Sequence, residues 1–154
     1  SIVGNVTTLQ TLVSFDAFSA GLLDVLGRRL VINGKGFFTT AGGETPTIRL
    51  DVYMAAASRA SITSAAVTAG LTNSPFEYEF VFQTSVTGAS GKLITTATML
   101  MSLDGTTYTN YMVIPDTDTT AFDLTGVFGP AVTVTCGGTA LTLIDVRSSY
   151  AKVS

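Results

Sequence analysis

The sequence contains no histidine, one cysteine and few charged residues. Without histidine, the Ser-His and Cys-His pairs that activate a nucleophile are impossible, and so are zinc sites that need an imidazole ligand. Only carboxylate chemistry, or no chemistry, is left. The single cysteine, Cys136, cannot form a disulfide within the chain, which is typical of a protein in a reducing compartment.

Charged side chains are scarce. Lys, Arg, Asp and Glu make up 12% of the 154 residues, against about 25% in typical soluble domains. With a mean hydropathy of +0.46, the chain must hide much apolar surface in its fold or in a permanent interface. This balance favours a homo-oligomer or a component of an assembly.

Two classes of partner are disfavoured by what the sequence lacks. The eight Lys and Arg residues are scattered, apart from Arg28-Arg29, and the net charge is −3, so no basic stripe is available for a phosphate backbone. No apolar run approaches the roughly 18 residues that span a bilayer, and the N-terminus lacks the basic start and cleavage site of a signal peptide. We therefore expect a soluble chain with no nucleic-acid and no membrane partner, not secreted by that route.

The clearest element is the aromatic stretch over residues 75–87. Phe76, Tyr78, Phe80 and Phe82 have one parity, and Glu77, Glu79 and Gln83 have the other. An extended chain therefore turns four rings to one face and carboxylates to the opposite face. A single strand cannot bury four rings alone, so a second layer must cover them.

Turn residues separate the other strands that the alternation of apolar and polar residues predicts. A loose arm (1–8) precedes a single domain (9–154), and residues 16–27 are expected to be a connection with one helical turn. The count of eight to ten strands predicts an all-β fold, an antiparallel sandwich or barrel. The predicted strands cover residues 8–15, 28–40, 47–55, 61–68, 75–87, 92–103, 108–114, 121–128, 132–136 and 140–146.

Two pairs of these strands are predicted to form hairpins. Residues 75–87 and 92–103 are joined by Gly88-Ala89-Ser90-Gly91, and residues 132–136 and 140–146 by Gly137-Gly138.

The side chains of two further strands also give expectations. Gly34 and Gly36 predict a bulge or a bend where their strand crosses between sheets. The strand over residues 47–55 is expected to be half-buried. Its predicted inward side chains are Ile48, Leu50, Val52 and Met54, and its predicted outward ones are Arg49, Asp51 and Tyr53.

Acidic pairs are the first candidates for chemistry. Asp116 and Asp118 have the D-x-D spacing with which a loop can offer oxygen atoms to Ca²⁺, but the Gly and the distal Glu of a calcium loop are missing, so a solvated turn is favoured. Glu77 and Glu79 would lie about 6 to 7 Å apart on one strand face, within the span of glycosidase carboxylate pairs. The need to keep an outer strand face soluble explains Glu77 and Glu79 better than catalysis does. No cofactor is expected.

Other candidate residues have an ordinary structural interpretation beside the functional one. Cys136 could be a reactive thiol, but a small buried residue at the end of a hairpin is the better interpretation. Gly34-Lys35-Gly36 lacks the spacing and the following helix of a phosphate loop, so it is interpreted as a bent strand. A last group, of three tyrosines and one methionine, could pack between subunits or stack on sugars, since aromatic residues are enriched at both kinds of surface. It consists of Tyr53, Tyr108, Tyr111 and Met112.

Four stretches, in their order and spacing, resemble a known family. They are TLVSFDAF, DVLGRRLVINGKGFFTT, SPFEYEFVFQTSVTGASGKL and AFDLTGVFGPAVTVTCGGTALTLIDV. The family consists of small virion proteins of tailed phages with a single jelly-roll or TNF-like domain, which trimerise and either decorate the capsid or cap tail fibres. The resemblance covers residues 11–146 and consists of turns and apolar alternation without an invariant chemical motif. Proteins of this kind do no chemistry.

The resemblance implies a jelly-roll homotrimer that is made in the host cytoplasm and binds the major capsid protein on the outer capsid surface. Tail-fibre members usually carry a fibrous segment before the jelly roll. Only about ten residues precede the first predicted strand here, so capsid decoration is favoured over a receptor-binding head that recognises host saccharides. Four arm residues are expected to contact the capsid, as an added strand at a sheet edge. They are Ile2, Val3, Asn5 and Val6.

Overall fold

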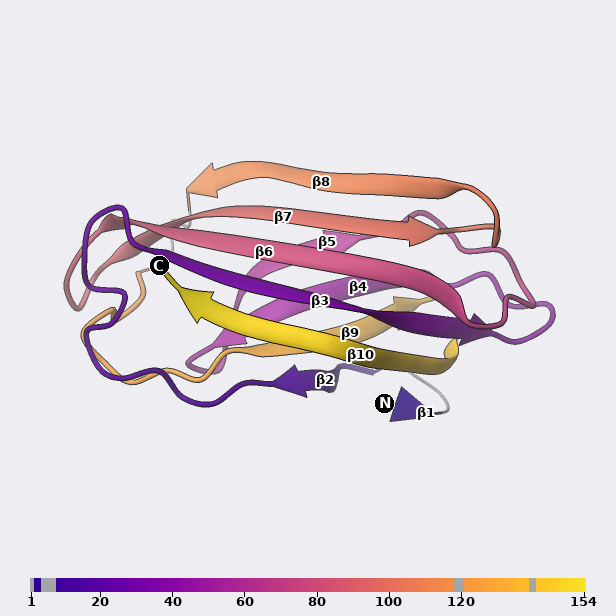
Figure 1. Cartoon of the computed structure of the whole chain (residues 1–154), viewed down its shortest axis with the longest axis horizontal. Coiled ribbons are helices and arrows are strands. Elements are labelled where there is room, and N and C mark those ends of the chain that lie inside the picture. The colour runs from indigo at the N-terminus through magenta and orange to yellow at the C-terminus, as the bar shows by residue number, and fades with distance from the viewer. Residues whose placement is uncertain (1, 4–7, 118–120, 139–140) are drawn as a thin grey trace.

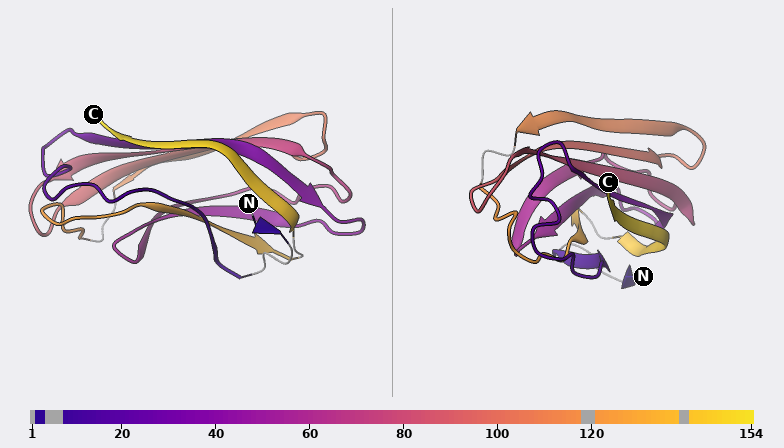
Figure 2. Two further views of the ribbon diagram at one scale, coloured as in Figure 1. Left: turned by 60° about the horizontal axis from the view of Figure 1, so that its bottom comes forward. Right: turned by 60° about the vertical axis from the view of Figure 1, so that its left-hand side comes forward.

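The computed structural model of the chain describes residues 2–3, 8–117, 121–138 and 141–154. Within this part, ten strands form two antiparallel sheets, and no helix is present. The two sheets lie face to face as a sandwich (Figures 1 and 2). The all-β sandwich of eight to ten strands that the sequence predicts is confirmed.

The larger sheet has the strand order β1-β10-β3-β6-β7-β8, and the smaller sheet has the order β2-β9-β4-β5. Most neighbours in space are distant in the sequence, because the chain crosses repeatedly between the sheets. The strands of the larger sheet are β1 (Ile2–Val3), β3 (Arg29–Thr40), β6 (Ser74–Val86), β7 (Lys92–Ser102), β8 (Tyr108–Thr117) and β10 (Leu141–Val153). Those of the smaller sheet are β2 (Gln10–Ser14), β4 (Thr47–Met54), β5 (Ala57–Thr63) and β9 (Ala131–Gly137).

The aromatic strand is β6, and its rings lie in the core as predicted. Neighbouring rings along the strand are in contact, with centroids 6.3 Å apart for Phe76 and Tyr78 and 6.0 Å apart for Tyr78 and Phe80. The smaller sheet covers this face with aliphatic side chains of β4 and β9, including Leu50 and Val132. Burial of rings of this size is the main favourable term that holds the two sheets together.

One of the two predicted hairpins exists and the other does not. β6 pairs with β7 from Phe76 opposite Met101 to Val86 opposite Lys92, as predicted. β9 and β10, which correspond to residues 132–136 and 140–146, lie in different sheets. A short glycine link can either reverse the chain within a sheet or lead it across the sandwich. The turn residues alone do not distinguish these two paths.

The predicted strand over residues 61–68 is displaced. The strand is β5, which follows β4 after a turn at Ala55 and Ala56, whose φ angles are 51° and 62°. Two successive positive φ angles are typical of the type I′ turn that joins hairpin strands. The sequence signal for this turn is normally Asn-Gly, and two alanines do not provide it.

Two smaller expectations are corrected. Residues 16–27 contain turns closed by the bonds Leu22 N–H to Ser19 O and Asp24 N–H to Gly21 O instead of a helical turn. Residues 121–128 form isolated bridges, although Phe122 is buried as the alternation predicts.

The glycines of β3 do not bend that strand into the other sheet. β3 pairs with β6 in unbroken register from Arg29 to Phe38. The irregularity lies in the neighbouring β10, where Arg147 is an extra residue between Val146 opposite Gly36 and Ser148 opposite Lys35. The predicted bulge is therefore next to the glycines but on the partner strand.

Asp51 projects outward from β4 beside Arg49 as predicted, yet it is only 2% exposed. Its carboxylate accepts hydrogen bonds from Arg49 Nε at 2.8 Å, Arg49 Nη2 at 2.7 Å and Ser58 Oγ at 3.1 Å. The carboxylate raises the pKa of the Arg49 guanidinium through this hydrogen bond and through its charge. Side chains of the sheet surface thus cover an acid that alternation alone assigns to solvent.

Candidate binding surface

The outer face is the surface of the larger sheet that points away from the smaller sheet. Residues directly opposite each other on paired strands share a face. Asn33 of β3 is opposite Glu79 of β6, Glu79 is opposite Thr98 of β7, and Thr98 is opposite Met112 of β8. One row of side chains therefore crosses four strands on the outer face.

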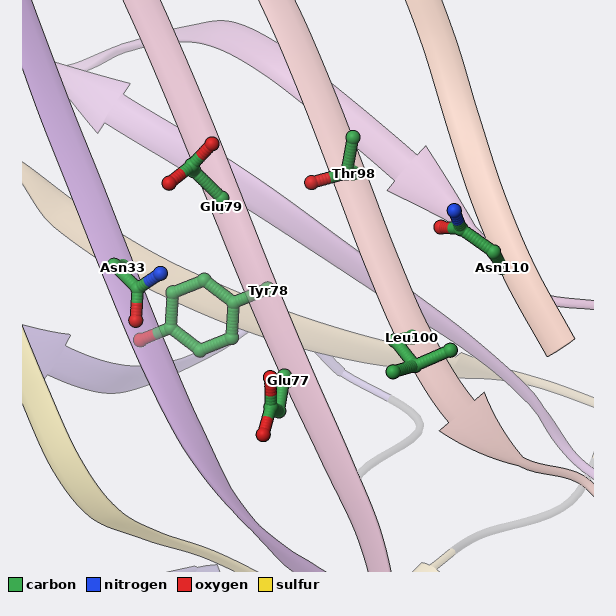
Figure 3. A pocket seen from close by; sticks show the side chains of 7 residues that line it. All are labelled: Asn33, Glu77, Tyr78, Glu79, Thr98, Leu100 and Asn110. Carbon is green, nitrogen blue, oxygen red and sulfur yellow. The ribbon is translucent and has the colours of Figure 1, made fainter. Parts of the chain in front are cut away.

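A hollow of about 280 Å³ lies in the middle of the outer face, and Figure 3 shows it from close by. Carboxylate, amide and hydroxyl groups from four strands converge on it. A ligand with several hydroxyl groups could accept and donate hydrogen bonds here. The lining residues are Asn33, Glu77, Tyr78, Glu79, Thr98, Leu100 and Asn110.

Glu77 and Glu79 project side by side from β6, as Figure 3 shows. Glycosidase carboxylates instead flank a bond from two sides. Among the described residues, none forms an ion pair with either carboxylate. A permanent protein contact over this part of the outer face would bury two unpaired charges at a high desolvation cost. The geometry therefore suits contact with solvent or a polar ligand.

Tyr78 forms the floor of this hollow from the core side. Its ring covers Gly34 of the neighbouring strand, where a β-carbon would overlap the phenol. Burial raises the pKa of the Tyr78 hydroxyl well above its ordinary value. The phenol thus remains protonated and acts as core packing.

A second hollow of about 300 Å³ adjoins the first and shares Glu77 with it. Phe37 and Pro75 supply its apolar wall, and Lys35 and Arg147 supply its cations. The β10 bulge places Arg147 here, where Nε lies 2.6 Å from Asp145 Oδ2. Bulges commonly redirect a side chain in this way.

The free edge of the larger sheet is the edge segment, residues 108–113 of β8. Tyr108 is 58% exposed and Met112 is 62% exposed, and both project to the outer face. Tyr111 points to the opposite side, where its hydroxyl oxygen accepts a hydrogen bond from Ala65 N–H at 3.1 Å. Tyr53 lies in the smaller sheet. Of the four residues predicted for a subunit contact or a ligand, the structure thus places Tyr108 and Met112 on the same face of one strand.

The arm residues that the sequence predicts as capsid contacts are only partly described. β1 pairs with β10, with Ile2 opposite Ile144 and Val3 opposite Leu143. Ile2 is partly buried against the core. Asn5 and Val6 lie outside the described residues. The described end of the arm is therefore a strand added to the edge of the molecule's own sheet, and its contact with a capsid stays a prediction.

The structure describes the metal candidates only in part, and it buries the cysteine. The backbone of Asp116 belongs to β8, whereas its side chain and the whole of Asp118 lie outside what the structure describes. The described residues contain no group of three acidic or cysteine side chains that could hold a metal ion. Cys136 is 4% exposed, and burial raises the pKa of its thiol to about 11, so the reactive thiolate is disfavoured. Gly34-Lys35-Gly36 lies inside β3.

Further exposed apolar side chains, here called the apolar tip, belong to segments at one end of the sandwich, the end drawn on the left in Figure 1. Three connections meet there, and hydrogen bonds tie them together, among them Gly27 N–H to Thr84 O and Leu124 N–H to Gly88 O. The expected helical turn within residues 16–27 does not indicate which leucine of this connection faces solvent. The tip consists of Val25, Leu26, Val86 and Val127, of which Leu26 is 70% and Val127 65% exposed.

The chain matches no protein-family model, no curated protein and no solved structure. In the part that the structure describes, no helix is long and apolar enough to cross a membrane.

Proposed function

We propose that the chain is a structural virion protein that decorates the outer capsid surface as a homotrimer and binds the major capsid protein. The observation that carries the proposal is the presence of two separate exposed apolar surfaces, the edge segment and the apolar tip, on a chain with few charges. Exposed apolar surfaces of this kind mark contacts with other chains, either further copies of the same protein or a different protein. The sequence resemblance supports the location on a virion.

The strand order supports the jelly-roll assignment within this proposal. In a jelly roll, eight strands wrap into two four-stranded sheets through two Greek keys. The chain contains two four-stranded sets that fit this arrangement, β1-β10-β3-β6 and β2-β9-β4-β5. The β7-β8 hairpin extends the first set to a six-stranded sheet. The proposed domain is thus an eight-stranded jelly roll with one added hairpin, and the edge segment lies on that addition.

The mechanism follows from multivalency. A trimer at a three-fold or quasi-three-fold position can touch several capsid subunits at once, so three weak contacts give high avidity. A protein that binds the assembled shell in preference to free subunits stabilises the shell by mass action. It would clamp the shell against the pressure of the packaged DNA, without a cofactor or a chemical step.

The first test is immunogold labelling of intact virions with an antibody against the chain, scored by position on the particle. Gold over the head facets is the expected result, and heat and osmotic stability of stripped and decorated capsids would then be compared. Gold at the tail tip would overturn the decoration assignment.

A pair of variants then separates the two candidate capsid contacts. Deleting residues 1–8 should abolish binding to capsids and leave the trimer folded, because the described part of the arm contributes two paired residues to the sheet. The matched variant keeps the arm and carries Leu26→Ser with Val127→Ser at the apolar tip. Unchanged binding after the deletion would contradict the role of the arm, and loss in the tip variant alone would move the contact to the tip.

The polar hollow of the outer face favours a second candidate, the saccharide-binding head of a tail fibre or spike. Amide, carboxylate and hydroxyl groups around an open hollow suit a sugar, and the nearby Tyr150 is exposed on the neighbouring β10. Binding of the isolated protein to a glycan array, lost in Glu79→Gln with Asn33→Ala, would support this function. Absence of binding to every glycan would count against it.

A further inference from the structure

The edge segment is an unprotected strand edge. β8 is the last strand of the larger sheet, so alternate residues point their N–H and C=O groups away from the sheet without a strand to receive them. Residues 108–113 pair with β7 without interruption, from Ser102 opposite Tyr108 to Ala97 opposite Val113. Over these six residues the strand has no charge, no proline and no bulge.

The other strand edges in the described part of the chain are protected by the usual means. β10 is covered at Leu143 and Ile144 by β1, and its remaining length carries Asp145, Arg147, Lys152 and a bulge. β2 has five residues and a bulge. β5 carries Arg59, and its pairing with β4 is interrupted. Natural proteins use charges, short strands and bulges to prevent edges from pairing with other chains. The far end of β8 is protected in the same way by Pro115, Asp116 and a bulge, and the edge segment is the part of β8 that lacks such a feature.

We propose that the edge segment pairs with the same segment of a second copy of the chain, antiparallel, about a two-fold axis at Asn110. Tyr108, Asn110 and Met112 share the outer face. In this register Asn110 of the two copies face each other, and Tyr108 of each copy lies opposite Met112 of the other. The Asn110 pair and the Tyr108–Met112 pairs are all uncharged. Contact between the Met112 sulfur and the Tyr108 ring is favourable, as sulfur–aromatic contacts generally are.

The pairing accounts for two unusual features of this strand, its unpaired backbone groups and its exposed apolar side chains. It supplies partners for the outward backbone groups of the edge, and it adds neighbours to Tyr108 and Met112, the two most exposed large apolar side chains among those described in the larger sheet. The occupant is a second copy because the segment is complementary to itself in this register. Two six-stranded sheets then become one continuous sheet.

The two-fold contact goes beyond the proposed function. A two-fold axis cannot close a trimer, so the contact would join subunits of neighbouring trimers and link them laterally over a shell. It needs only two copies of the chain. Its test on purified protein is therefore independent of where the protein lies on a virion.

The test is a single introduced cysteine on the axis. Asn110→Cys places two thiols face to face at the Cα separation of an antiparallel pair, which fits disulfide geometry. Cys136 is buried and is left in place in every variant. The matched control is Thr107→Cys, an exposed position three residues away, where the two copies would be roughly 20 Å apart along the strands. Under mild oxidation we expect a covalent dimer, at twice the 16.0 kDa of one chain, with Asn110→Cys at least about tenfold faster than with Thr107→Cys.

A second change tests the pairing itself. Met112→Lys added to Asn110→Cys introduces charge at the edge and should reduce the rate of dimer formation about tenfold, while the circular dichroism spectrum stays that of a folded β-protein. No dimer with Asn110→Cys, equal rates at the two cysteine positions, or an unchanged rate in the Met112→Lys background would each overturn the proposal.

Discussion

Gly36 is required by the close approach of β10 to β3. A β-carbon at this position would overlap the backbone carbonyl oxygen of Asp145, just before the bulged Arg147. Backbone atoms cannot move aside as a flexible side chain can, so Gly36→Ala should lower the free energy of unfolding by about 3 kcal/mol. Gly42→Ala is the control, because no atom lies within 4 Å of its β-carbon and its φ is not positive. Urea unfolding of the two variants measures the difference, and equal stabilities would refute the packing argument.

Cys136 gives a prediction for alkaline pH. Burial raises the pKa of its thiol from about 9 to about 11. Below pH 9 the thiol is protonated in both states, so the native state has its full stability. As the pH rises from 9 towards 11, the unfolded chain loses the proton first, and stability is lost. Burial raises the pKa of Tyr78 as well, which adds a loss in the same direction above pH 10.

Urea unfolding measured between pH 8 and pH 11 checks the prediction for Cys136. Cys136→Ala should lose less stability over this range than the natural chain. At pH 8, the thiol of the folded chain should react with a disulfide reagent about 100-fold more slowly than in urea, because its thiolate is scarcer by two orders of magnitude. A thiol that reacts equally fast in both states would show that Cys136 is accessible.

At the level of elements, the β4–β5 turn is the least well matched to its sequence. Ala55 and Ala56 both have positive φ, which costs a residue with a β-carbon about 1 kcal/mol or more. Ala56→Gly should relieve this strain, stabilise the chain by about 1 kcal/mol and raise Tm by roughly 2–4 °C. The same change at Ala66, an exposed position without a positive φ, should lower Tm instead. Differential scanning calorimetry of both variants checks the prediction, and a lower Tm for Ala56→Gly would contradict it.

The elements also show what alternation can and cannot predict. The aromatic strand was predictable because four rings of one parity leave only one way to bury them. The β6–β7 hairpin followed from two long strands and a short glycine-rich link. The same kind of link at Gly137-Gly138 leads to the other sheet, since the choice depends on which sheet has a free edge for the next strand. That information lies in distant residues.

The candidate surface was less predictable than the fold. Tyr108 and Met112 could be named from their residue types, but their exposure depends on β8 being an edge strand, which only the strand order establishes. The exposure of Leu26 could not be predicted from its residue type, because the structure buries Leu23 in the same connection and leaves Leu26 in solvent. The hollow of the outer face needs four strands in register, and no local pattern describes it.

For the whole molecule, we expect one cooperative unfolding transition. The buried apolar side chains of both sheets belong to a single cluster, and rings of β6 pack against aliphatic residues of β4 and β9. Neither sheet can keep its inner face covered if the other unfolds. Circular dichroism and the reactivity of the Cys136 thiol should therefore report the same urea midpoint. Two separate midpoints would show that the sheets unfold independently.

The strand order also has a consequence for how the protein is made. β2 pairs with β9 and β3 pairs with β10, so strands near the start of the chain cannot complete their pairing until the last two strands are present. Folds dominated by such distant pairs form in milliseconds to seconds, slower than folds built from local contacts. On the ribosome neither sheet can be completed before β9 and β10 emerge. Until then the rings of β6 are not fully covered. The nascent chain is therefore a suitable substrate for a chaperone that shields exposed apolar segments.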